Sequence, residues 1–202
     1  MVNNDLAVWR YDTSGKLDPY FGIGGVATFD SGEMNYGQGI ALDHLHNILV
    51  TGYINVNSNG NLVVWRFTKT GSLDVTFGGN GLVTYDGGHF DGGYGAMEDS
   101  SYGVLASGMT NNGTNEDMLL LRYNQDGSTD EAFGSGGRVA FDSGRSDYGY
   151  ALIPGPADSI LVAGSSMLIM NNDMVIWKFG SSGATDESFG SGGRAVYAGG
   201  YD

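Results

Sequence analysis

The chain has 202 residues, of which 36 are glycine and 3 are proline; 41% are apolar and 12% aromatic, which indicates a turn-rich β protein and not a disordered Pro/Gly chain. The formal net charge of −14 argues against nucleic acid and anionic membrane surfaces as partners, because both would repel the protein. The absence of cysteine excludes disulfides and thiolate zinc sites, and no apolar run approaches the roughly 18 residues of a membrane span.

One segment of the sequence occurs four times at a constant interval of 56 residues. It reads AVWRYDTSGKLDPYFGIGG at residues 7–25 and returns at 63–81, 119–137 and 175–193. A basic residue marks the same place in every copy, at Arg10, Arg66, Arg122 and Lys178. A period this regular predicts a repeat architecture.

Each period contains short apolar runs, separated by turn residues, that predict β-strands. The first run is apolar on both alternating faces, as in a strand covered on both sides. In chain order, the first run lies at 6–12, 62–68, 118–124 and 174–180, the second at 26–30, 82–86, 138–142 and 194–198, the third at 37–43, 93–99 and 148–153, and the fourth at 48–53, 102–109 and 160–165.

The turn between the first and second runs has its own repeated chemistry. A glycine supplies the positive φ of a tight connection, an aspartate accepts hydrogen bonds from backbone N–H groups of the turn, and a phenylalanine fills the space beneath. With the four cations, the structural repeat positions are Asp18, Asp74, Asp130 and Asp186, and Phe21, Phe77, Phe133 and Phe189.

Four strands in a period of about 50 residues predict the blade of a β-propeller. We therefore expect an all-β, β-propeller-type repeat protein with four-stranded antiparallel blades. Residues 1–202 form a single domain, in which 1–36 are a partial repeat and 37–92, 93–148 and 149–202 are approximately one blade each. The 14 expected strands make three blades and an additional pair, which cannot close a ring of four-stranded blades.

The repeats also resemble a known group of sequences. The segments GKLDPYFGIGGVA (15–27), GSLDVTFGGNGLV (71–83) and GSTDEAFGSGGRVA (127–140), with NILVTG (47–52) and SILVAG (159–164), are similar to the delta-60 repeat family. These are predicted β-propeller repeats found in tandem, mainly in exported bacterial proteins. The resemblance implies a propeller fold and a place outside the cytoplasm, on the cell surface or in the extracellular space. It brings no catalytic residues, and the third run of the middle copy, GYGAMED, departs from the pattern.

The repeated cations have two interpretations. A ring of basic residues could bind an anion. Alternatively, each cation is paired within the protein, because a buried arginine needs a partner. The candidate partners are the aspartate of the turn or the aspartate that ends the second run (Asp30, Asp86, Asp142), and we favour this structural interpretation.

Sites for metals are weakly indicated. Residues 124–130, NQDGSTD, place oxygen ligands on alternate residues as a calcium loop does, but no glutamate stands at the twelfth position, so an Asp/Gly turn is preferred. Calcium held elsewhere by acidic loops stays an alternative. His44 and His46 lie in a predicted turn without a third ligand, so no metal site is predicted there.

No catalytic or cofactor-binding residue is predicted. No nucleophile elbow is present, and the glycine-rich strings precede strands and lack the Lys-Ser/Thr of a phosphate loop. The equivalent Trp9, Trp65 and Trp177 are interpreted as packing between blades, with a sugar-stacking platform as the alternative. The protein is therefore expected not to be an enzyme.

Two functions fit these observations. The first is a non-catalytic extracellular or cell-surface structural protein that self-associates through its incomplete blades, as the subunit of a ring or a filament. The alternative is an adhesin in which the Asn-rich loops 55–61 and 110–117 bind a glycan or a surface protein. The expected partners are thus other copies of the chain or a glycan or surface protein, with no nucleic acid and no membrane insertion.

Overall fold

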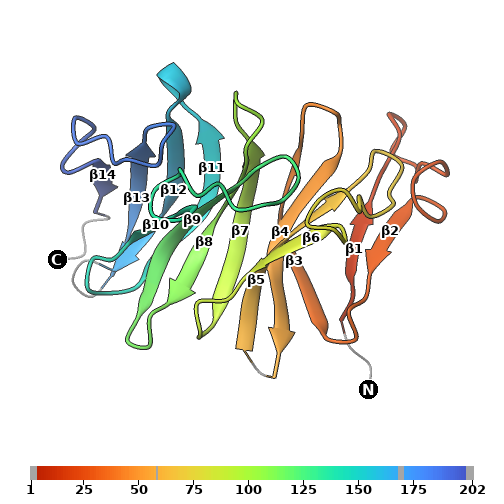
Figure 1. Ribbon diagram of the computed structural model, residues 1–202, viewed down its shortest axis with the longest axis horizontal. Coiled ribbons are helices and arrows are strands. Elements are labelled where there is room, and N and C mark those ends of the chain that lie inside the picture. Colours follow the sequence, from red (N-terminus) through yellow and green to blue (C-terminus); the bar gives the residue numbers. More distant parts are fainter. Residues whose placement is uncertain (1–3, 58, 168–170, 199–202) are drawn as a thin grey trace.

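The computed structural model describes residues 4–57, 59–167 and 171–198. In them the chain forms fourteen strands and one short 3-10 turn at Pro156–Asp158 (Figure 1). The strands are β1 (Leu6–Trp9), β2 (Val26–Phe29), β3 (Met34–Leu42), β4 (Ile48–Val56), β5 (Asn59–Phe67), β6 (Leu82–Tyr85), β7 (Asp91–Glu98), β8 (Val104–Asn111), β9 (Glu116–Tyr123), β10 (Arg138–Phe141), β11 (Asp147–Pro154), β12 (Ile160–Met167), β13 (Asn172–Phe179) and β14 (Arg194–Tyr197).

The strands form three four-stranded antiparallel sheets and one two-stranded sheet. We call β3–β6 blade 1, β7–β10 blade 2 and β11–β14 blade 3, and β1–β2 the half blade. Within each blade the strands lie in the order of the chain, so each blade is a meander. The predicted all-β, propeller-type architecture with four-stranded antiparallel blades is confirmed. The blades begin at Met34, Asp91 and Asp147, slightly before the expected boundaries at 37, 93 and 149.

The strand register repeats with the sequence. The half blade pairs Leu6 with Phe29, and blade 1 pairs the equivalent Leu62 with Tyr85. The first strand of every blade carries a bulge at the same place, between Gly37 and Gly39 in β3 and between Gly93 and Gly95 in β7. The atypical run GYGAMED therefore keeps the common register, because its two glycines provide the same bulge.

The hydrophobic core lies between the blades. Alternate residues of each strand face opposite neighbours, so blades 1 and 2 each contribute one side to each of two clusters. In blade 1, Trp65 faces the half blade and packs with Leu6, Val8 and Phe21, whereas Val64 faces blade 2. Both faces of an internal blade are thus buried, as the doubly apolar first runs predict.

The repeated turn also joins neighbouring blades. The backbone N–H of Gly22 donates to the carbonyl of Thr70 in the next repeat at 2.8 Å. The same bond recurs at the same length in the next two pairs, Gly78 N to Asp126 O and Gly134 N to Ser182 O. Gly71 has a φ of +89°, and a Cβ there would stand 2.7 Å from the Gly22 nitrogen. Only glycine allows both this conformation and this close approach.

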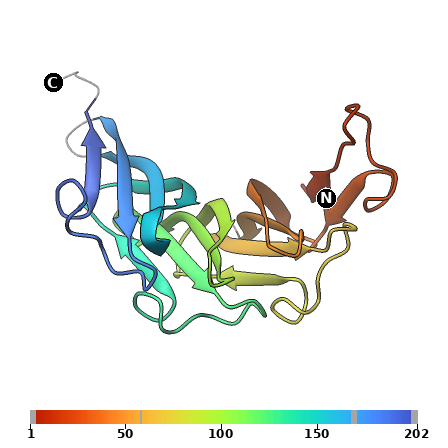
Figure 2. The ribbon, with the colours of Figure 1, turned by 90° about the horizontal axis from the view of Figure 1, so that it is seen from above.

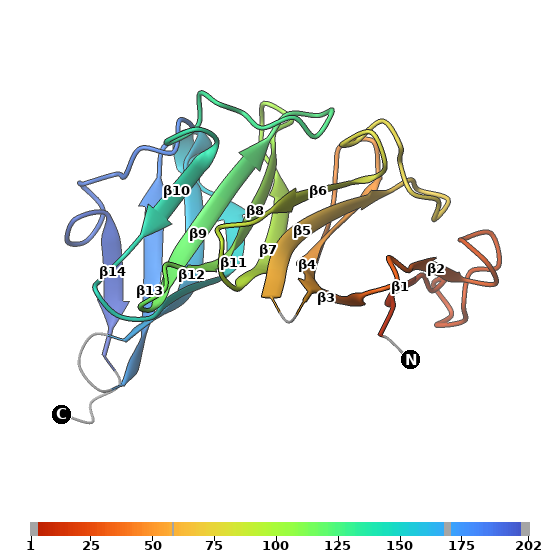
Figure 3. The ribbon, with the colours of Figure 1, turned by 60° about the horizontal axis from the view of Figure 1, so that its bottom comes forward.

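The blades follow one another along an open arc, with the half blade at one end and blade 3 at the other (Figure 2). The two ends do not meet. Figure 3 shows β1 and β2 set beside β3 at the N-terminal end. In the part of the chain that the structure describes, no helix has the length and apolar character needed to cross a membrane.

Candidate functional site

The four repeat cations form ion pairs with the aspartates of the turn. The distances between nitrogen and carboxylate oxygen are 2.9 Å for Arg10–Asp18, 2.8 Å for Arg66–Asp74, 2.6 Å for Arg122–Asp130 and 2.9 Å for Lys178–Asp186. Arg122 forms a second pair with Asp99 at 2.7 Å. The positive charge of each cation is therefore compensated within the protein, which disfavours a ring of cations for an external anion.

The same cations lie over the phenylalanine rings of their repeats. The distances to the ring centroids are 4.6 Å for Arg10 and Phe21, 4.6 Å for Arg66 and Phe77, 5.8 Å for Arg122 and Phe133, and 5.8 Å for Lys178 and Phe189. Arg66 also donates to the carbonyl oxygen of Gln125 in the next repeat at 2.6 Å, and Arg10 donates to that of Lys69. Arg10 and Arg66 thus connect strand, turn and neighbouring blade.

Two of the turn aspartates, Asp74 and Asp186, have lowered pKa values because local donors stabilise the carboxylate. Hydrogen bonds from the Ser188 hydroxyl and from Lys178 lower the pKa of Asp186 to about 2. Burial opposes ionisation of Asp74, but bonds from Thr76 and the charge of Arg66 outweigh it and lower its pKa. The ion pairs of Asp74 and Asp186 are accordingly present at neutral pH.

The suspected metal ligands have other contacts. Asp126, in the loop that resembles a calcium site, accepts hydrogen bonds from the backbone N–H and the hydroxyl of Ser128 at 2.9 and 2.6 Å, which is an Asx turn. His44 Nδ1 lies 2.9 Å from Glu98 Oε1 in the next blade. Among the described residues, no group of three His, Asp or Glu side chains is arranged to hold a metal ion.

The Asn-rich loops use much of their polar capacity internally. Asn112 donates to the Asp117 carboxylate at 3.1 Å, and Asn115 donates to the Arg145 carbonyl oxygen at 2.6 Å. In the loop 55–61, Ser58 lies outside the described residues. Glycan binding by these loops stays a prediction.

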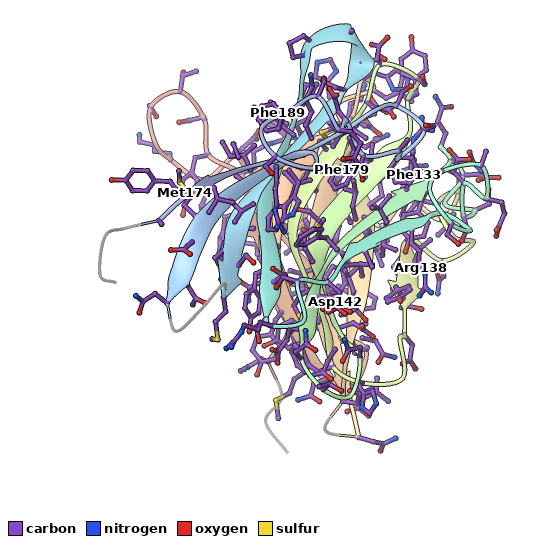
Figure 4. All side chains as sticks on the ribbon, turned by 90° about the vertical axis from the view of Figure 1, so that its left-hand side faces the viewer. Phe133, Arg138, Asp142, Met174, Phe179 and Phe189 are labelled. Carbon is purple, nitrogen blue, oxygen red and sulfur yellow. The ribbon has the colours of Figure 1, made fainter. Side chains whose placement is uncertain are left out.

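Blade 3, at the C-terminal end of the array, exposes side chains whose equivalents in blades 1 and 2 are buried. We define the C-end face as Leu161, Ala163, Met174, Ile176 and Phe189 of blade 3. Their equivalents in blades 1 and 2 are completely buried: Leu49, Thr51, Leu62, Val64 and Phe77, and Leu105, Ser107, Met118, Leu120 and Phe133. Met174 is 55% exposed, and the other four are half-buried or exposed. Figure 4 views the molecule from this end, with Met174 and Phe189 labelled.

The half blade, at the N-terminal end of the array, also exposes a face that is buried in the other blades. We define the N-end face as Ala7, Trp9 and Tyr11 of the half blade. Trp9 is 56% exposed, whereas its equivalents Trp65 and Trp177 are 0% and 2% exposed. The core interpretation of the tryptophans is therefore confirmed for Trp65 and Trp177 and wrong for Trp9, because no described residue covers this face of the half blade.

The glycine of the repeated turn also shows that the N-terminal end lacks a neighbouring repeat among the described residues. A Cβ at Gly71, Gly127 or Gly183 would meet the turn of the preceding repeat, at a nitrogen 2.5 to 2.9 Å away. At the equivalent Gly15 nothing lies within 4 Å. Reasoning from the sequence predicted open blade faces but did not name their residues, although the repeat period and the alternation of the strands contained the signal.

The fold and the repeated turn together define a β-propeller repeat protein. The model of a family described as "Domain of unknown function (DUF5122) beta-propeller" matches residues 47–77 and 104–133. Each matched segment contains the second strand of a blade, its third strand and the Gly-Asp-Phe turn. The two matched segments are similar to this family of β-propeller repeats, and the more specific delta-60 assignment stays a resemblance.

Comparison with solved structures gives a match to a fucose lectin from Kordia zhangzhouensis in complex with methyl-fucoside. The TM-score is 0.41 and the identity 14%, over 79% of this chain and 96% of the lectin. A likeness at this level carries no argument about function. No curated protein shows significant sequence similarity to the chain.

Proposed function

We propose that this chain is a non-catalytic extracellular or cell-surface structural subunit that self-associates head to tail through its two open ends, into a ring or a filament. One observation supports the proposal: the chain has two exposed end faces, and the equivalent residues of the other blades are buried against each other inside the chain. The C-end face repeats the surface that blade 2 presents to blade 3. The N-end face repeats the surface that blade 1 presents to the half blade.

The two end faces should fit each other, because the equivalent faces pack together at each contact between blades within the chain. Within the array, residues of the C-end type always pack against residues of the N-end type in the following blade. Stacking the half blade of a second copy on blade 3 repeats this contact between outer strands. Such a contact is heterologous, because different surfaces of the two copies meet, and it generates rings or open filaments according to the rotation.

The hydrogen bonds between turns continue the same series. The donors Gly22, Gly78 and Gly134 each bond a carbonyl in the following repeat. The next donor in the series is Gly190, and the equivalent acceptor is the carbonyl of Ser14 in a second copy. The open space beside Gly15 leaves room for this approach.

The exposed area is consistent with an unsatisfied surface. A compact monomer of 21.3 kDa exposes about 9,100 Å². This chain exposes 10329 Å², an excess of about 1,200 Å². Specific interfaces bury about 800 Å² on each partner, so the excess is of the size that two end faces would account for.

The proposal is tested with one variant for each end. Trp9→Lys places a charge on the N-end face, and Met174→Lys places one on the C-end face. Both positions are more than half exposed, so the fold should tolerate the change. We expect light scattering on a sizing column to show oligomers for the unmodified protein and monomers of 21.3 kDa for each variant.

Mixing the two variants distinguishes the geometry. Each variant keeps one functional end, so the mixture should form a capped dimer of twice the monomer mass and nothing larger. Val75→Lys, at an apolar residue of similar exposure in a loop outside both faces, is the matched control and should associate normally. A monomeric unmodified protein at all concentrations, or a mixture that stays monomeric, contradicts the proposal. Negative-stain images of the unmodified protein separate rings from filaments.

A further inference from the structure

A groove lies between the half blade and blade 1. Its volume is about 630 Å³, and it runs between the backbone of residues 4–9, which include β1, and residues 35–40 of β3. Val50 of β4 forms part of its lining. The groove occupies the place where a complete blade would have its first two strands, because β1 and β2 are equivalent to the third and fourth strands of the other blades.

One wall of the groove is an open strand edge. In blade 1, β5 pairs with β4 on one side and β6 on the other, whereas the described part of the chain pairs β1 only with β2. Arg10 bonds Gly25 on the β2 side. Because backbone groups alternate along an antiparallel strand, the N–H and C=O groups of Ala7 and Trp9 point to the open edge. Such an edge is a template for another strand.

The other wall of the groove is β3, which is less covered than the first strands of blades 2 and 3. Ile40 is 65% exposed, whereas Leu152 at the equivalent place in blade 3 is 7% exposed beneath blade 2. In blade 2, Gly93 packs against Gly52, in the second strand of blade 1, and a Cβ at Gly93 would be 3.0 Å from the Gly52 carbonyl oxygen. A Cβ at the equivalent Gly37 would meet the side chains of Leu6 and Val50 and no backbone of a neighbouring strand, because the described residues give the half blade no second strand.

We propose that this groove binds a β-hairpin in trans, supplied by another polypeptide that carries the same type of repeat. The complete blades specify the ligand: a first strand with a glycine bulge, followed by an apolar second strand antiparallel to β1. In blade 1, Val63 is opposite Gly52 and Trp65 is opposite Val50. The ligand therefore places a glycine opposite Ala7 and a β-branched or small apolar residue opposite Trp9.

A second copy of this chain does not provide such a hairpin in its folded state. Its pairs β3–β4, β7–β8 and β11–β12 are all paired with the outer strands of their own blades. Hairpin binding uses the open backbone edge of β1 and is thus separate from the head-to-tail contact, which uses the side chains of the N-end face. A variant can abolish one and leave the other.

The probe is a fluorescent peptide with the sequence of residues 91–111, which contain β7 and β8. We expect saturable binding to the full chain, measured by fluorescence anisotropy. The matched control is the peptide with Gly108→Val, because a side chain at this glycine would collide with the first strand of the hairpin at Gly92. The control peptide should not bind.

Two protein variants examine the walls of the groove. Ala7→Pro removes one N–H from the open edge and keeps the groups that pair with β2, so it should weaken peptide binding by about tenfold. Ile40→Lys should also weaken binding, whereas Ile153→Lys, at a site of similar exposure on blade 3, should not. Circular dichroism verifies that each variant is folded.

Three outcomes overturn the inference. The first is no saturable signal up to about 1 mM protein, which corresponds to a binding free energy weaker than about −4 kcal/mol. The second is equal binding of the Gly108→Val peptide. The third is loss of self-association in Ile40→Lys with the unmodified oligomer unable to bind peptide, because a second copy is then the occupant. Loss of oligomers in Met174→Lys with peptide binding retained supports the inference and separates it from the head-to-tail contact.

Discussion

The ion pair at Arg66 allows the contribution of burial to be measured against a control in the same chain. Arg66 donates to Asp74 at 2.8 Å, to Gln125 O at 2.6 Å and to Thr76 at 3.1 Å. Arg10 makes the equivalent bonds to Asp18 and to the Lys69 carbonyl. The two side chains differ in exposure, at 9% for Arg66 and 35% for Arg10.

Replacing each arginine by methionine keeps much of the apolar stem and removes the charge. Breaking a buried pair costs about 3 to 5 kcal/mol, because one charge is left buried without its partner. Asp74 keeps its bonds from Thr76, so we expect the lower limit, a loss of about 3 kcal/mol in the free energy of unfolding for Arg66→Met. Arg10→Met should cost about 1 kcal/mol or less, as for exposed pairs.

Urea unfolding followed by circular dichroism gives both values. Measuring them in the Met174→Lys background keeps association from contributing to the apparent stability. Equal losses for the two substitutions would refute the reasoning from burial. If Arg66→Met leaves stability unchanged but abolishes binding of an anion such as phosphate or sulfate, the cations serve a ligand and not the fold.

Two further predictions concern the open end and a buried acid. Gly15→Asn, at a φ of +79° that asparagine tolerates, should abolish self-association in light scattering without changing the urea midpoint, and unchanged association would exclude Gly15 from the contact. Burial raises the pKa of Asp91, so the folded protein binds a proton more readily than the unfolded chain, and stability falls as pH rises above the ordinary pKa of 3.8. Asp91→Asn, which introduces the residue found at the equivalent Asn35 of blade 1, should therefore unfold at a higher urea concentration than the unmodified protein at pH 7. This difference in urea midpoint should vanish below pH 3.8, and a difference that stays constant with pH would contradict the prediction.

The repeat made most of the fold predictable. Four copies of one turn fix the order of the strands, and the cation and aspartate eight residues apart are close enough to pair once the turn folds back. Even the atypical run at 93–99 keeps its register, because Gly93 and Gly95 provide the bulge that the other blades have.

The ends of the array could not be predicted in the same way. A repeat period equates Trp9 with Trp65, yet Trp65 is covered by the half blade and Trp9 by nothing within the described chain. Sequence equivalence gives the chemistry of a position but not the presence of its neighbour. The 3-10 turn at Pro156–Asp158, where blade 1 has the turn containing His44, also has no counterpart in the repeat pattern.

The half blade has one further consequence, for the order in which the molecule unfolds. In a linear array each unit is stabilised by its immediate neighbours, and a lone two-stranded sheet is marginal in water. The half blade has two strands and a single covered face, so amide groups of β1 and β2 should exchange with solvent before those of blades 1 and 2. The N-terminal end is thus the region where folding is completed last and where any bound partner adds most to the rigidity of the protein.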